Sequence, residues 1–301
     1  MSSQISNQMS DKLAALCPRS ILFVPADKPD VAIKAIRSQA DAVCLDLEDA
    51  VAPSNKASAR TNLQALLEQA AIHNKPVWVR INSDLLNAAL DINALPNDLA
   101  VGAVNIVVPK VQGWSQLQWI DEALISCSKA NQTPGIVAMF EDVAAINHCL
   151  NSNAPVSIKL AALALGTEDL SSDLGVKPNP QLLSMVLYDL VKLGRKLNAP
   201  VLGFPDSIAI ITDTALLEQS IACAQQIGSS GAFCIHPKQL DAVNKGFMPS
   251  EDEIAWAKAT MTLEAKINAE GVGVHPITKR MVDPPVIDQA KRILLRVALT
   301  P

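Results

Sequence analysis

Short apolar runs that end in polar or charged residues recur along the chain. The clearest occupies residues 42–51, where Ala-Val-Cys-Leu leads directly into Asp46, Glu48 and Asp49. An apolar run without a turn residue predicts a strand that is buried on both faces. Because buried charge is costly unless it is paired or binds a cation, three carboxylates at the end of this strand predict a functional site.

The same pattern, an apolar run with a polar tip, predicts eight strands separated by helical segments. The predicted strands are residues 21–25, 42–46, 77–82, 103–110, 135–140, 160–165, 200–204 and 232–236. The predicted helices between them are residues 29–39, 53–69, 116–129, a segment ending at 150, 181–198 and 216–227.

Strands that alternate with helices in this way over about 220 residues are typical of a (β/α)₈ barrel, the α/β fold also called the TIM barrel. The polar tips all follow their strands, and the active site of such barrels lies at that end. Acids and bases that are distant in sequence are therefore expected to converge. A doubly wound open sheet is the competing fold, but the chain contains neither a G-x-G-x-x-G nor a P-loop motif. We therefore predict the barrel.

The chain continues beyond the predicted barrel into a helical extension. Ser250 and Glu253 have the capping-box spacing of a helix start, and this helix is expected to run to about residue 270. Gly-Val-Gly at residues 271–273 then breaks it, and a last amphipathic helix is expected over residues 287–297. The predicted parts are a flexible N-terminal arm, the barrel and the C-terminal extension, at residues 1–18, 19–248 and 249–301.

Composition narrows the class of protein. Of the 301 residues 49% are hydrophobic, which is ample for a large core, and the net charge of −5 gives no general attraction for nucleic acid or an anionic membrane. The six cysteines are scattered without a C-x-x-C motif, which favours a reducing compartment. The first eighteen residues lack the apolar segment of a signal peptide, and no run of eighteen apolar residues occurs. We expect a soluble, cytoplasmic protein with neither nucleic-acid nor membrane partners.

Acids at the tips of two neighbouring strands are candidates for a metal site. Glu141 and Asp169 follow the fifth and sixth predicted strands, which are adjacent in a barrel. Two carboxylates there can hold a hard divalent cation, since Mg²⁺ takes one or two carboxylates together with water and substrate oxygens. Glu48 and Asp49 would lie across the barrel mouth and bind the water molecules of that cation. The alternative is that each acid caps a helix N-terminus, where negative charge is favourable.

Arg80 is a candidate anion-binding residue. It lies within the apolar run Val-Trp-Val-Arg-Ile-Asn, so its charge needs an anionic partner. The planar guanidinium fits a carboxylate with two hydrogen bonds. The alternative is a salt bridge to Glu48 or Asp49, which would not exclude a role in binding substrate.

Other basic residues leave more than one interpretation open. His236 ends the eighth predicted strand, where a structural hydrogen bond and a functional role are both open. Lys28, Lys110 and Arg19 would either bind phosphate groups or simply be solvated. The chain has no H-E-x-x-H and no G-x-S-x-G motif, and its cysteines lack a neighbouring His, so zinc, serine and thiol catalysis are not supported.

Several of these segments occur together, and in the same order, in one known family. They are Arg19-Ser-Ile-Leu-Phe-Val-Pro25, Asp46-Leu-Glu-Asp-Ala-Val51, Val79-Arg-Ile-Asn82, Val108-Pro-Lys110, Gly166-x-Glu-Asp-Leu170, Ile235-His-Pro237, Pro249-Ser250 and Met281-Val-Asp283. On these motifs the chain resembles the citrate lyase β-subunit and malyl-CoA lyase family, within the wider HpcH/HpaI aldolase group. The resemblance extends from about Arg19 to Leu295.

The resemblance implies a Mg²⁺-dependent carbon–carbon lyase, with Mn²⁺ as an alternative metal. Such an enzyme cleaves or forms a 3-hydroxyacyl thioester of coenzyme A, for example malyl-CoA, citramalyl-CoA or citryl-CoA, to give an acyl-CoA and a 2-oxo acid. By their places in the motifs, Glu141 and Asp169 match the metal ligands, and Arg80 matches the residue that binds the oxo-acid carboxylate. Glu48 and Asp49 match acids that are hydrogen-bonded around the metal water.

The resemblance also extends to the C-terminal extension and to the assembly. Asp283 matches an aspartate that the family supplies from its C-terminal lid, often from a neighbouring subunit, near the thioester. Arg19 and Lys28 fall where the family contacts coenzyme A. Family members are commonly trimers or hexamers, so a homotrimer or homohexamer is expected here.

Two departures from the family pattern place the substrate in question. The family usually has Ile-Glu-Thr where this chain has Phe140-Glu141-Asp142, and it usually has glycine where this chain has Ala26. Three alternatives to a coenzyme A lyase therefore stay open. They are a citrate lyase β-like subunit that acts on an acyl carrier protein thioester, a metal-dependent aldolase of free hydroxy-oxo acids, and a non-catalytic partner in a larger lyase complex.

Overall fold

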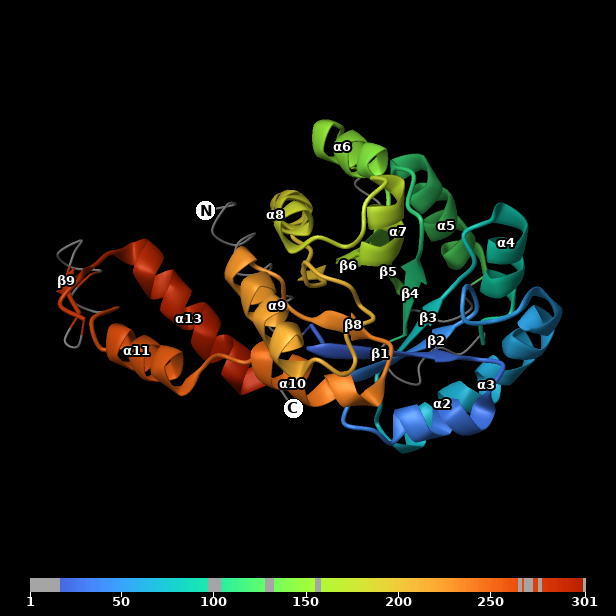
Figure 1. Ribbon diagram of the computed structural model, residues 1–301, viewed down its shortest axis with the longest axis horizontal. Coiled ribbons are helices and arrows are strands. Elements are labelled where there is room, and N and C mark those ends of the chain that lie inside the picture. The colour runs from blue at the N-terminus through green and yellow to red at the C-terminus, as the bar shows by residue number, and fades with distance from the viewer. Residues whose placement is uncertain are drawn as a thin grey trace.

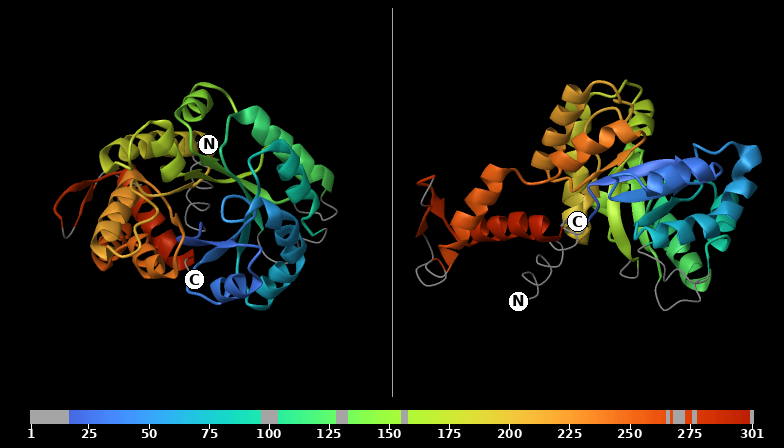
Figure 2. Two further views of the ribbon diagram at one scale, coloured as in Figure 1. Left: turned by 45° about the vertical axis from the view of Figure 1, so that its right-hand side comes forward. Right: turned by 90° about the horizontal axis from the view of Figure 1, so that it is seen from below.

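A curved sheet of eight parallel strands, surrounded by helices, forms an almost closed barrel (Figures 1 and 2). The computed structural model describes residues 17–96, 104–127, 133–154, 158–264, 267, 273–275 and 278–299. Most of the predicted N-terminal arm, residues 1–16, lies outside the described residues. The (β/α)₈ barrel predicted from the sequence is confirmed.

Strands and helices alternate along the chain as the sequence pattern predicts. The barrel strands are β1 (Ser20–Pro25), β2 (Ala42–Asp46), β3 (Val77–Arg80), β4 (Asn105–Val108), β5 (Gly135–Phe140), β6 (Leu160–Leu165), β7 (Val201–Leu202) and β8 (Ala232–Cys234). The α-helices around them are α2 (Pro29–Ile36), α3 (Lys56–Ile72), α4 (Leu85–Asn93), α5 (Trp114–Cys127), α6 (Val143–Asn151), α7 (Thr167–Asp173), α8 (Pro180–Leu197), α9 (Thr214–Ile227) and α10 (Leu240–Gly246). Two 3₁₀ turns, η1 (Pro53–Asn55) and η2 (Pro237–Gln239), complete this part of the chain.

Three short helices, α4, α7 and α10, are absent from the sequence-based prediction. Each has only seven to nine residues and lies directly after a polar strand tip or turn. Segments this short do not repeat the helical period often enough to be recognised from apolar spacing alone. The helix over residues 167–173 matters most, because it carries Asp169.

The apolar runs of the strands are continuous because both faces of the sheet are covered. Cys44 and Trp78 point into the barrel, where they pack with Ile21, Val107 and Phe233. The next residues along the same strands, Leu45 and Val79, belong instead to the larger core between the sheet and the helices. Successive side chains of a strand point to opposite faces, so a strand that is buried on both faces has no polar alternation.

The barrel is closed between β7 and β8 at a glycine. The strand order is β7–β6–β5–β4–β3–β2–β1–β8, and Leu202 forms a parallel bridge to Gly231, directly before β8. The Gly203 N–H donates to the Gly231 carbonyl at 2.8 Å. A Cβ atom at position 231 would lie 2.2 Å from the carbonyl oxygen of Pro18, so a side chain has no room there.

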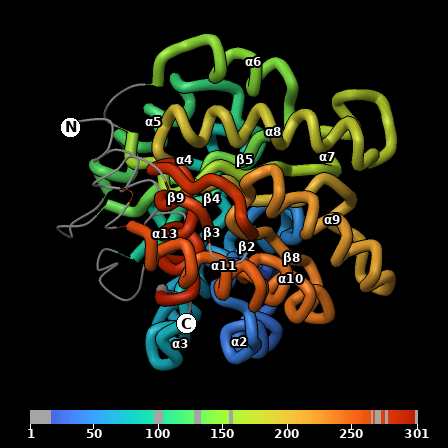
Figure 3. Tube along the Cα trace, turned by 90° about the vertical axis from the view of Figure 1, so that its left-hand side faces the viewer, coloured from blue at the N-terminus to red at the C-terminus, as the bar shows by residue number. Residues whose placement is uncertain are grey.

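The C-terminal extension contains two helices and a hairpin with a small core of their own. α11 (Glu251–Met261) and α13 (Pro284–Leu299) lie side by side, and β9 (Gly273–Val274) pairs antiparallel with β10 (Met281–Val282) (Figure 3). Ile267, Val282 and Ile287 form a cluster separate from the barrel cores. The capping box of Ser250 and Glu253 is present as predicted, but α11 ends at Met261 rather than near residue 270.

This extension joins the barrel at the end opposite to the polar strand tips. Arg296, near the end of α13, donates to the carbonyls of Cys17 and Ser230, each at 2.8 Å. Both carbonyls lie at the amino ends of barrel strands, β1 and β8. The rest of the extension projects away from the barrel (Figures 1 and 2). In the described part of the chain no helix is both long and apolar enough to cross a membrane.

Replacing Gly231 by alanine should destabilise the fold. The added methyl group would meet backbone oxygen atoms of Pro18 and Arg19 that no rotamer change can move. We expect the free energy of unfolding to fall by about 2–3 kcal/mol, measured by urea denaturation. Gly273→Ala is the matched control, because its Cβ would lie 3.4 Å or more from its neighbours. Equal, small losses for both variants would show that the close approach at Gly231 does not constrain the barrel.

Candidate active site

Asp46, the last residue of β2, organises the acidic loop that follows this strand. Its fully buried carboxylate accepts the backbone N–H groups of Glu48 at 2.9 Å and Ala50 at 3.0 Å. The same carboxylate receives two hydrogen bonds from Arg80, at 2.8 Å from Nε and 2.6 Å from Nη2. The sequence identifies Asp46 only as one of three acids. Its position opposite Arg80 in the parallel pairing of β2 and β3 gives it this role.

Arg80 is buried among acids and lies over an aromatic ring. Its Nη1 lies 3.3 Å from Glu48 Oε2 and 3.5 Å from Asp49 Oδ2, and its guanidinium lies 4.6 Å from the centre of the Phe23 ring. Burial would lower the pKa of Arg80, but the hydrogen bonds and charge of Asp46, with the charge of Glu48, raise it above the usual arginine value. The salt bridges considered for Arg80 are thus present, and the closest one is to Asp46.

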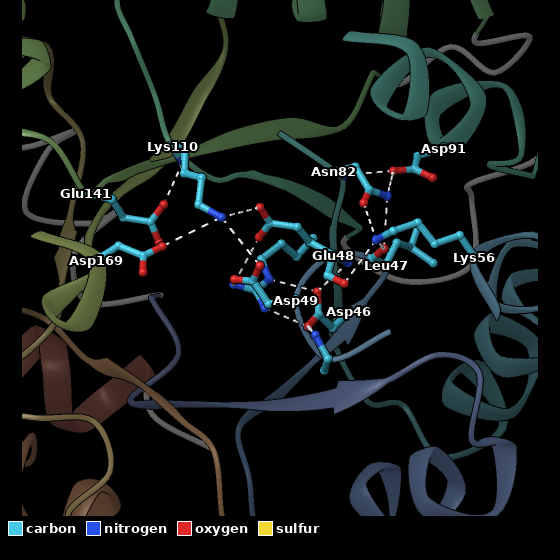
Figure 4. Close-up of polar contacts among 12 residues, drawn as sticks. Asp46, Leu47, Glu48, Asp49, Lys56, Asn82, Asp91, Lys110, Glu141 and Asp169 are labelled. Carbon is cyan, nitrogen blue, oxygen red and sulfur yellow. Dashed lines mark hydrogen bonds and ion pairs between the residues drawn. The ribbon is translucent and has the colours of Figure 1, made fainter. Parts of the chain in front are cut away.

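A polar network of Lys56, Asn82 and Asp91 holds the acidic loop from one side (Figure 4). Lys56 Nζ donates to the carbonyls of Leu47 at 2.9 Å and Glu48 at 3.1 Å, and also to Asn82 Oδ1. Asn82 donates from Nδ2 to the Leu47 carbonyl at 2.9 Å and to buried Asp91 at 2.7 Å. These bonds fix the backbone at residues 47 and 48, so the Glu48 side chain points to the barrel mouth.

Glu141 and Asp169 come together at the tips of β5 and β6, as predicted. Phe140 pairs with Leu165, which places Glu141 beside Gly166. A Cβ atom at position 166 would lie 2.3 Å from Glu141 Cγ, so the glycine makes room for the carboxylate. Asp169 reaches the same place from the first turn of α7.

The charge state of Glu141 depends on its surroundings. Its burial, and then the charges of Asp169 and Glu48, outweigh the backbone hydrogen bond from Lys110 and raise the pKa of Glu141 to about 7. Burial also raises the pKa of Glu48, against the lowering effect of Arg80 and Lys110. Negative charge is therefore in excess at this end of the barrel, and a cation would relieve it.

Lys110 lies between the two groups of acids (Figure 4). Its Nζ is 2.9 Å from Glu48 Oε1, 3.4 Å from Asp49 Oδ1 and 3.7 Å from Asp169 Oδ2. Partial burial opposes the charge of Lys110, but the hydrogen bond to Glu48 and the neighbouring carboxylates raise its pKa above the usual lysine value. Lys110, considered above as a phosphate ligand or a solvated side chain, is thus partly exposed and paired with these carboxylates.

The residues at this end of the barrel fit a hard divalent cation. Glu141 and Asp169 supply carboxylate oxygens, the ligand type that Mg²⁺ prefers. The buried Glu48 Oε2 accepts no hydrogen bond from any described residue, and the Lys110 ammonium already lies among the acids as a cation would. Within the described residues no three His, Cys, Asp or Glu side chains are grouped so as to hold an ion by themselves. Two protein carboxylates leave the other positions for water and substrate oxygens, as is usual for Mg²⁺.

Two cavities meet at the Glu141–Asp169 pair. The first, of about 430 Å³, is also lined by Arg80 and Asp49 and has an apolar wall that includes Phe23, Met139, Leu165, Ile208 and Phe233. The second, of about 600 Å³, lies between β4, α6 and α7 and is lined by Gln112, His148 and Ser172. The first cavity is the candidate substrate site, because it combines the acids and Arg80 with an enclosed apolar wall.

The unusual residues at two family motif positions have structural roles. Asp142 caps α6 and accepts the Ala145 N–H at 2.6 Å. This is the helix-capping role considered for tip acids, and it directs the Asp142 carboxylate to the helix rather than to Glu141. Ala26 is fully buried, and its N–H donates to the Asp46 carbonyl at 3.0 Å.

Not all of the predicted site residues lie at the strand tips. Lys28 is exposed just after β1, at the correct end of the barrel. Arg19 instead lies before β1, at the opposite end, where it forms a salt bridge of 2.7 Å with Asp41. Since a six-residue strand spans roughly 20 Å, Arg19 cannot reach a ligand at the tips of its own chain. His236 has the structural role considered for it, because its Nδ1 accepts the Lys238 N–H and caps η2.

Asp283 also lies away from the acids of its own chain. It precedes α13, where its Oδ1 accepts the Val286 N–H at 3.3 Å. Arg296, thirteen residues further along α13, contacts the amino ends of β1 and β8, and the intervening helix is about 20 Å long. Within one chain, therefore, Asp283 is not brought together with Glu141, Asp169 and Arg80.

Comparison with known proteins adds independent information about this barrel. The family model described as HpcH/HpaI aldolase/citrate lyase matches residues 19–237. The citrate lyase subunit beta of Escherichia coli strain K12 is 27% identical over 286 residues, covering 94% of each chain. The L-malyl-CoA/beta-methylmalyl-CoA lyase of Rhodobacter capsulatus is 28% identical over 305 residues, covering 92% of this chain and 93% of the relative.

A solved structure is similar over nearly the whole chain. Protein CitE from Mycobacterium tuberculosis, in complex with magnesium, acetoacetate and coenzyme A, aligns with a TM-score of 0.70 and 25% sequence identity. The alignment covers 93% of this chain and 98% of that protein. The similarity thus includes most of the C-terminal extension as well as the barrel.

Binding of Mg²⁺ should strengthen as the pH rises through about 7. Below that value Glu141 is protonated in the metal-free protein, so a cation must displace the proton; above it the carboxylate is already charged. We expect the dissociation constant, measured by isothermal titration calorimetry, to fall about tenfold between about pH 6 and about pH 8. Asp169→Ala should abolish binding at both values. Equal affinity of the unmodified protein at the two pH values would contradict the assignment of Glu141 as a ligand.

Proposed function

The chain belongs to the HpcH/HpaI aldolase/citrate lyase family, and from this premise we propose that it is a Mg²⁺-dependent carbon–carbon lyase. Its substrate class is a 3-hydroxyacyl thioester of coenzyme A, and its products are an acyl-CoA and a 2-oxo acid. The main support is the Glu141–Asp169 pair at the mouth of the same cavity as Arg80. A cation site and a buried guanidinium at one cavity are what a 2-oxo acid requires.

Each end of the oxo acid has a partner in this arrangement. Glu141 and Asp169 would hold a divalent cation, which would supply Lewis acidity and orient the oxo acid. Arg80 fixes the carboxylate with N–H groups that its bonds to Asp46 leave available. Asp46 and the Phe23 ring hold the plane of the guanidinium, so Arg80 presents these groups in one direction.

In the cleavage direction the hydroxyl on C3 of the thioester gives its proton to a neighbouring carboxylate, Glu48 or Asp49, and the bond between C2 and C3 breaks. The electron pair of this bond forms the enolate of the acyl thioester, while C3 becomes the keto carbon of the 2-oxo acid. The assignment of Glu48 or Asp49 as proton acceptor is supported by Asp49, which lines the cavity, and by Glu48 Oε2, which lies 3.3 Å from Arg80 Nη1 and accepts no hydrogen bond from the described residues. The enolate then takes a proton at C2 from an acid, and we assign this step to Asp283.

Asp283 would act in the site of a neighbouring subunit. Its distance from the strand tips of its own chain is fixed by the attachment of α13 to the opposite end of the barrel. The extension, residues 249–301, would then serve as a lid on another copy and exclude water from the enolate. Such an arrangement requires an oligomer, and a homotrimer or homohexamer provides it.

The charge of the cavity favours a 2-oxo acid with one carboxylate. Asp46, Asp49, Glu141, Glu168 and Asp169 line it, whereas Arg80 is the basic residue of its wall among the described residues. A second carboxylate, as in oxaloacetate, would face this excess of negative charge. Glyoxylate and pyruvate have one carboxylate each, and the methyl group of pyruvate suits the apolar wall.

The second candidate is a citrate lyase β-like subunit acting on an acyl carrier protein thioester. It is favoured by the 27% identity with citrate lyase subunit beta, which extends over 94% of both chains. An aldolase of free hydroxy-oxo acids is less well supported, because its substrate has no thioester enolate for Asp283 to protonate. The retained acids also argue against a non-catalytic partner.

Cleavage assays with a panel of thioesters test the proposal. We expect Mg²⁺-dependent release of a 2-oxo acid from malyl-CoA, β-methylmalyl-CoA or citramalyl-CoA, and slower release from citryl-CoA because oxaloacetate carries the second carboxylate. Oxo-acid release is followed by reduction with a coupled dehydrogenase, with and without EDTA.

Each other result assigns a different function. Cleavage of citryl thioester only on an acyl carrier protein would identify the β-like subunit instead. Cleavage of free hydroxy-oxo acids would identify an aldolase. Inactivity towards the whole panel in a folded protein that binds Mg²⁺ would reject the lyase proposal.

Replacing Asp283 by asparagine should leave thioester binding intact but lower turnover at least 100-fold, because a positioned general acid contributes about that much. The test of its subunit of origin is complementation with Asp169→Ala, which should be inactive by itself. In mixed oligomers, made by co-expression and isolated with two affinity tags, some sites combine an intact Asp169 with an intact Asp283 from a neighbour. Recovered activity is expected in the mixture. Its absence from confirmed mixed oligomers would place Asp283 in its own subunit's site or outside catalysis.

A further inference from the structure

Lys110 has a backbone conformation that its role so far does not explain. Its φ of +48° lies in the left-handed region, which residues other than glycine seldom adopt without a functional or structural reason. In this conformation its N–H turns away from the sheet and donates to Glu141 Oε2 at 2.7 Å. The next residue resumes contact with β5, where the Val111 N–H donates to the Met139 carbonyl at 3.2 Å.

The side chain of Lys110 reaches acids from two separate parts of the barrel. It contacts Glu48 and Asp49 after β2 and Asp169 in α7, at N–O distances between 2.9 and 3.7 Å. Its backbone contacts Glu141 after β5. One residue thus touches all four acids assigned to the metal and its surroundings, and its side chain is 41% exposed, so the ammonium is free to change position.

Because Arg80 is paired with Asp46, Lys110 is the counter-ion of the other four acids. Arg80 makes its two shortest ion contacts with Asp46, so this pair is close to neutral by itself. Lys110 then offsets one of the four charges on Glu48, Asp49, Glu141 and Asp169. A divalent cation would offset two more, and an anionic substrate would add at least one negative charge.

We propose that the Lys110 ammonium is a built-in counter-cation that weakens divalent-cation binding but strengthens binding of the anionic 2-oxo acid. This inference rests on the proposed function, because it takes Glu141 and Asp169 as the cation ligands. The first effect follows from competition, since Lys110 and a divalent cation are both attracted to Asp169 and Glu48 and repel each other. The second follows because Lys110 lowers the negative charge that remains beside the oxo acid after the cation is bound.

These two effects of opposite sign distinguish a counter-cation from a structural residue. If Lys110 only held Glu141 and the acidic loop in place, its replacement would weaken the binding of both Mg²⁺ and the 2-oxo acid. If it only bound substrate, its replacement would leave the affinity for Mg²⁺ unchanged. Only a positive charge shared between the acids predicts that one affinity rises while the other falls.

The test is calorimetry with Mg²⁺ alone, followed by pyruvate added to the Mg²⁺-saturated protein, for the unmodified chain and two variants. Lys110→Gln removes the charge and shortens the side chain by only one atom, and Lys110→Asn suits the left-handed backbone. Both keep the N–H that contacts Glu141. For both we expect Mg²⁺ to bind about tenfold more tightly and pyruvate about tenfold more weakly, as loss of one nearby unit charge predicts.

Two controls accompany these variants. Lys245→Gln removes the same charge from an exposed lysine paired with Asp241, and it should change neither affinity. Lys110→Arg keeps the charge and should stay close to the unmodified protein in its affinity for pyruvate. Thermal unfolding of every variant confirms that it is folded.

The outcomes separate this inference from the function on which it rests. If the unmodified protein binds no Mg²⁺, the assignment of Glu141 and Asp169 as cation ligands is rejected. The role proposed for Lys110 is then rejected as well. If the unmodified protein binds Mg²⁺ but both folded variants bind it equally or more weakly, the cation site stands and the competition by Lys110 is rejected. If Mg²⁺ binding tightens while pyruvate binding does not differ, the support of the oxo acid by Lys110 is rejected.

Discussion

The balance of charge at the carboxyl ends of the strands is the constraint on which the rest of the site depends. Several carboxylates converge there, and those of Asp46, Glu48 and Glu141 are buried away from water. Two cationic side chains are present. Arg80 forms a nearly neutral pair with Asp46, and Lys110 leaves the other acids short of positive charge. Burial raises the pKa of Glu141, and the charges of Asp169 and Glu48 add to this effect. A divalent cation would offset this shortage of positive charge.

The scaffold maintains this unfavourable concentration of charge through backbone and glycine geometry. Parallel pairing places Asp46 directly opposite Arg80, and the absence of a side chain at Gly166 lets Glu141 approach β6. Bonds from Lys56 and Asn82 hold the carbonyls of the acidic loop. The acids therefore repel one another without being able to separate, which is how a barrel prepares a cation site in advance.

Most of the fold is encoded in local sequence patterns, because each strand is an apolar run that is covered on both faces. All eight strands were predictable for this reason. Helices of seven to nine residues carry little periodicity, and among them α2 and α6 were predicted whereas α4, α7 and α10 were missed. The direction of the C-terminal extension was not predictable either. It depends on contacts of Arg296 with the amino ends of β1 and β8, which are distant in sequence.

By itself the sequence determined which strand-end residues are candidates for the site, because charged residues at the ends of apolar runs must lie where buried strands reach solvent or a ligand. Glu141, Asp169 and Arg80 could be selected on this ground. Only the tertiary structure decided how they are paired. In the folded chain Arg80 forms its salt bridge with Asp46, and the Lys110 ammonium lies among the acids. Arg19 lies at the opposite end of the barrel. Pairing depends on strand register and on backbone angles such as that of Lys110, which are set by contacts between segments far apart in the chain.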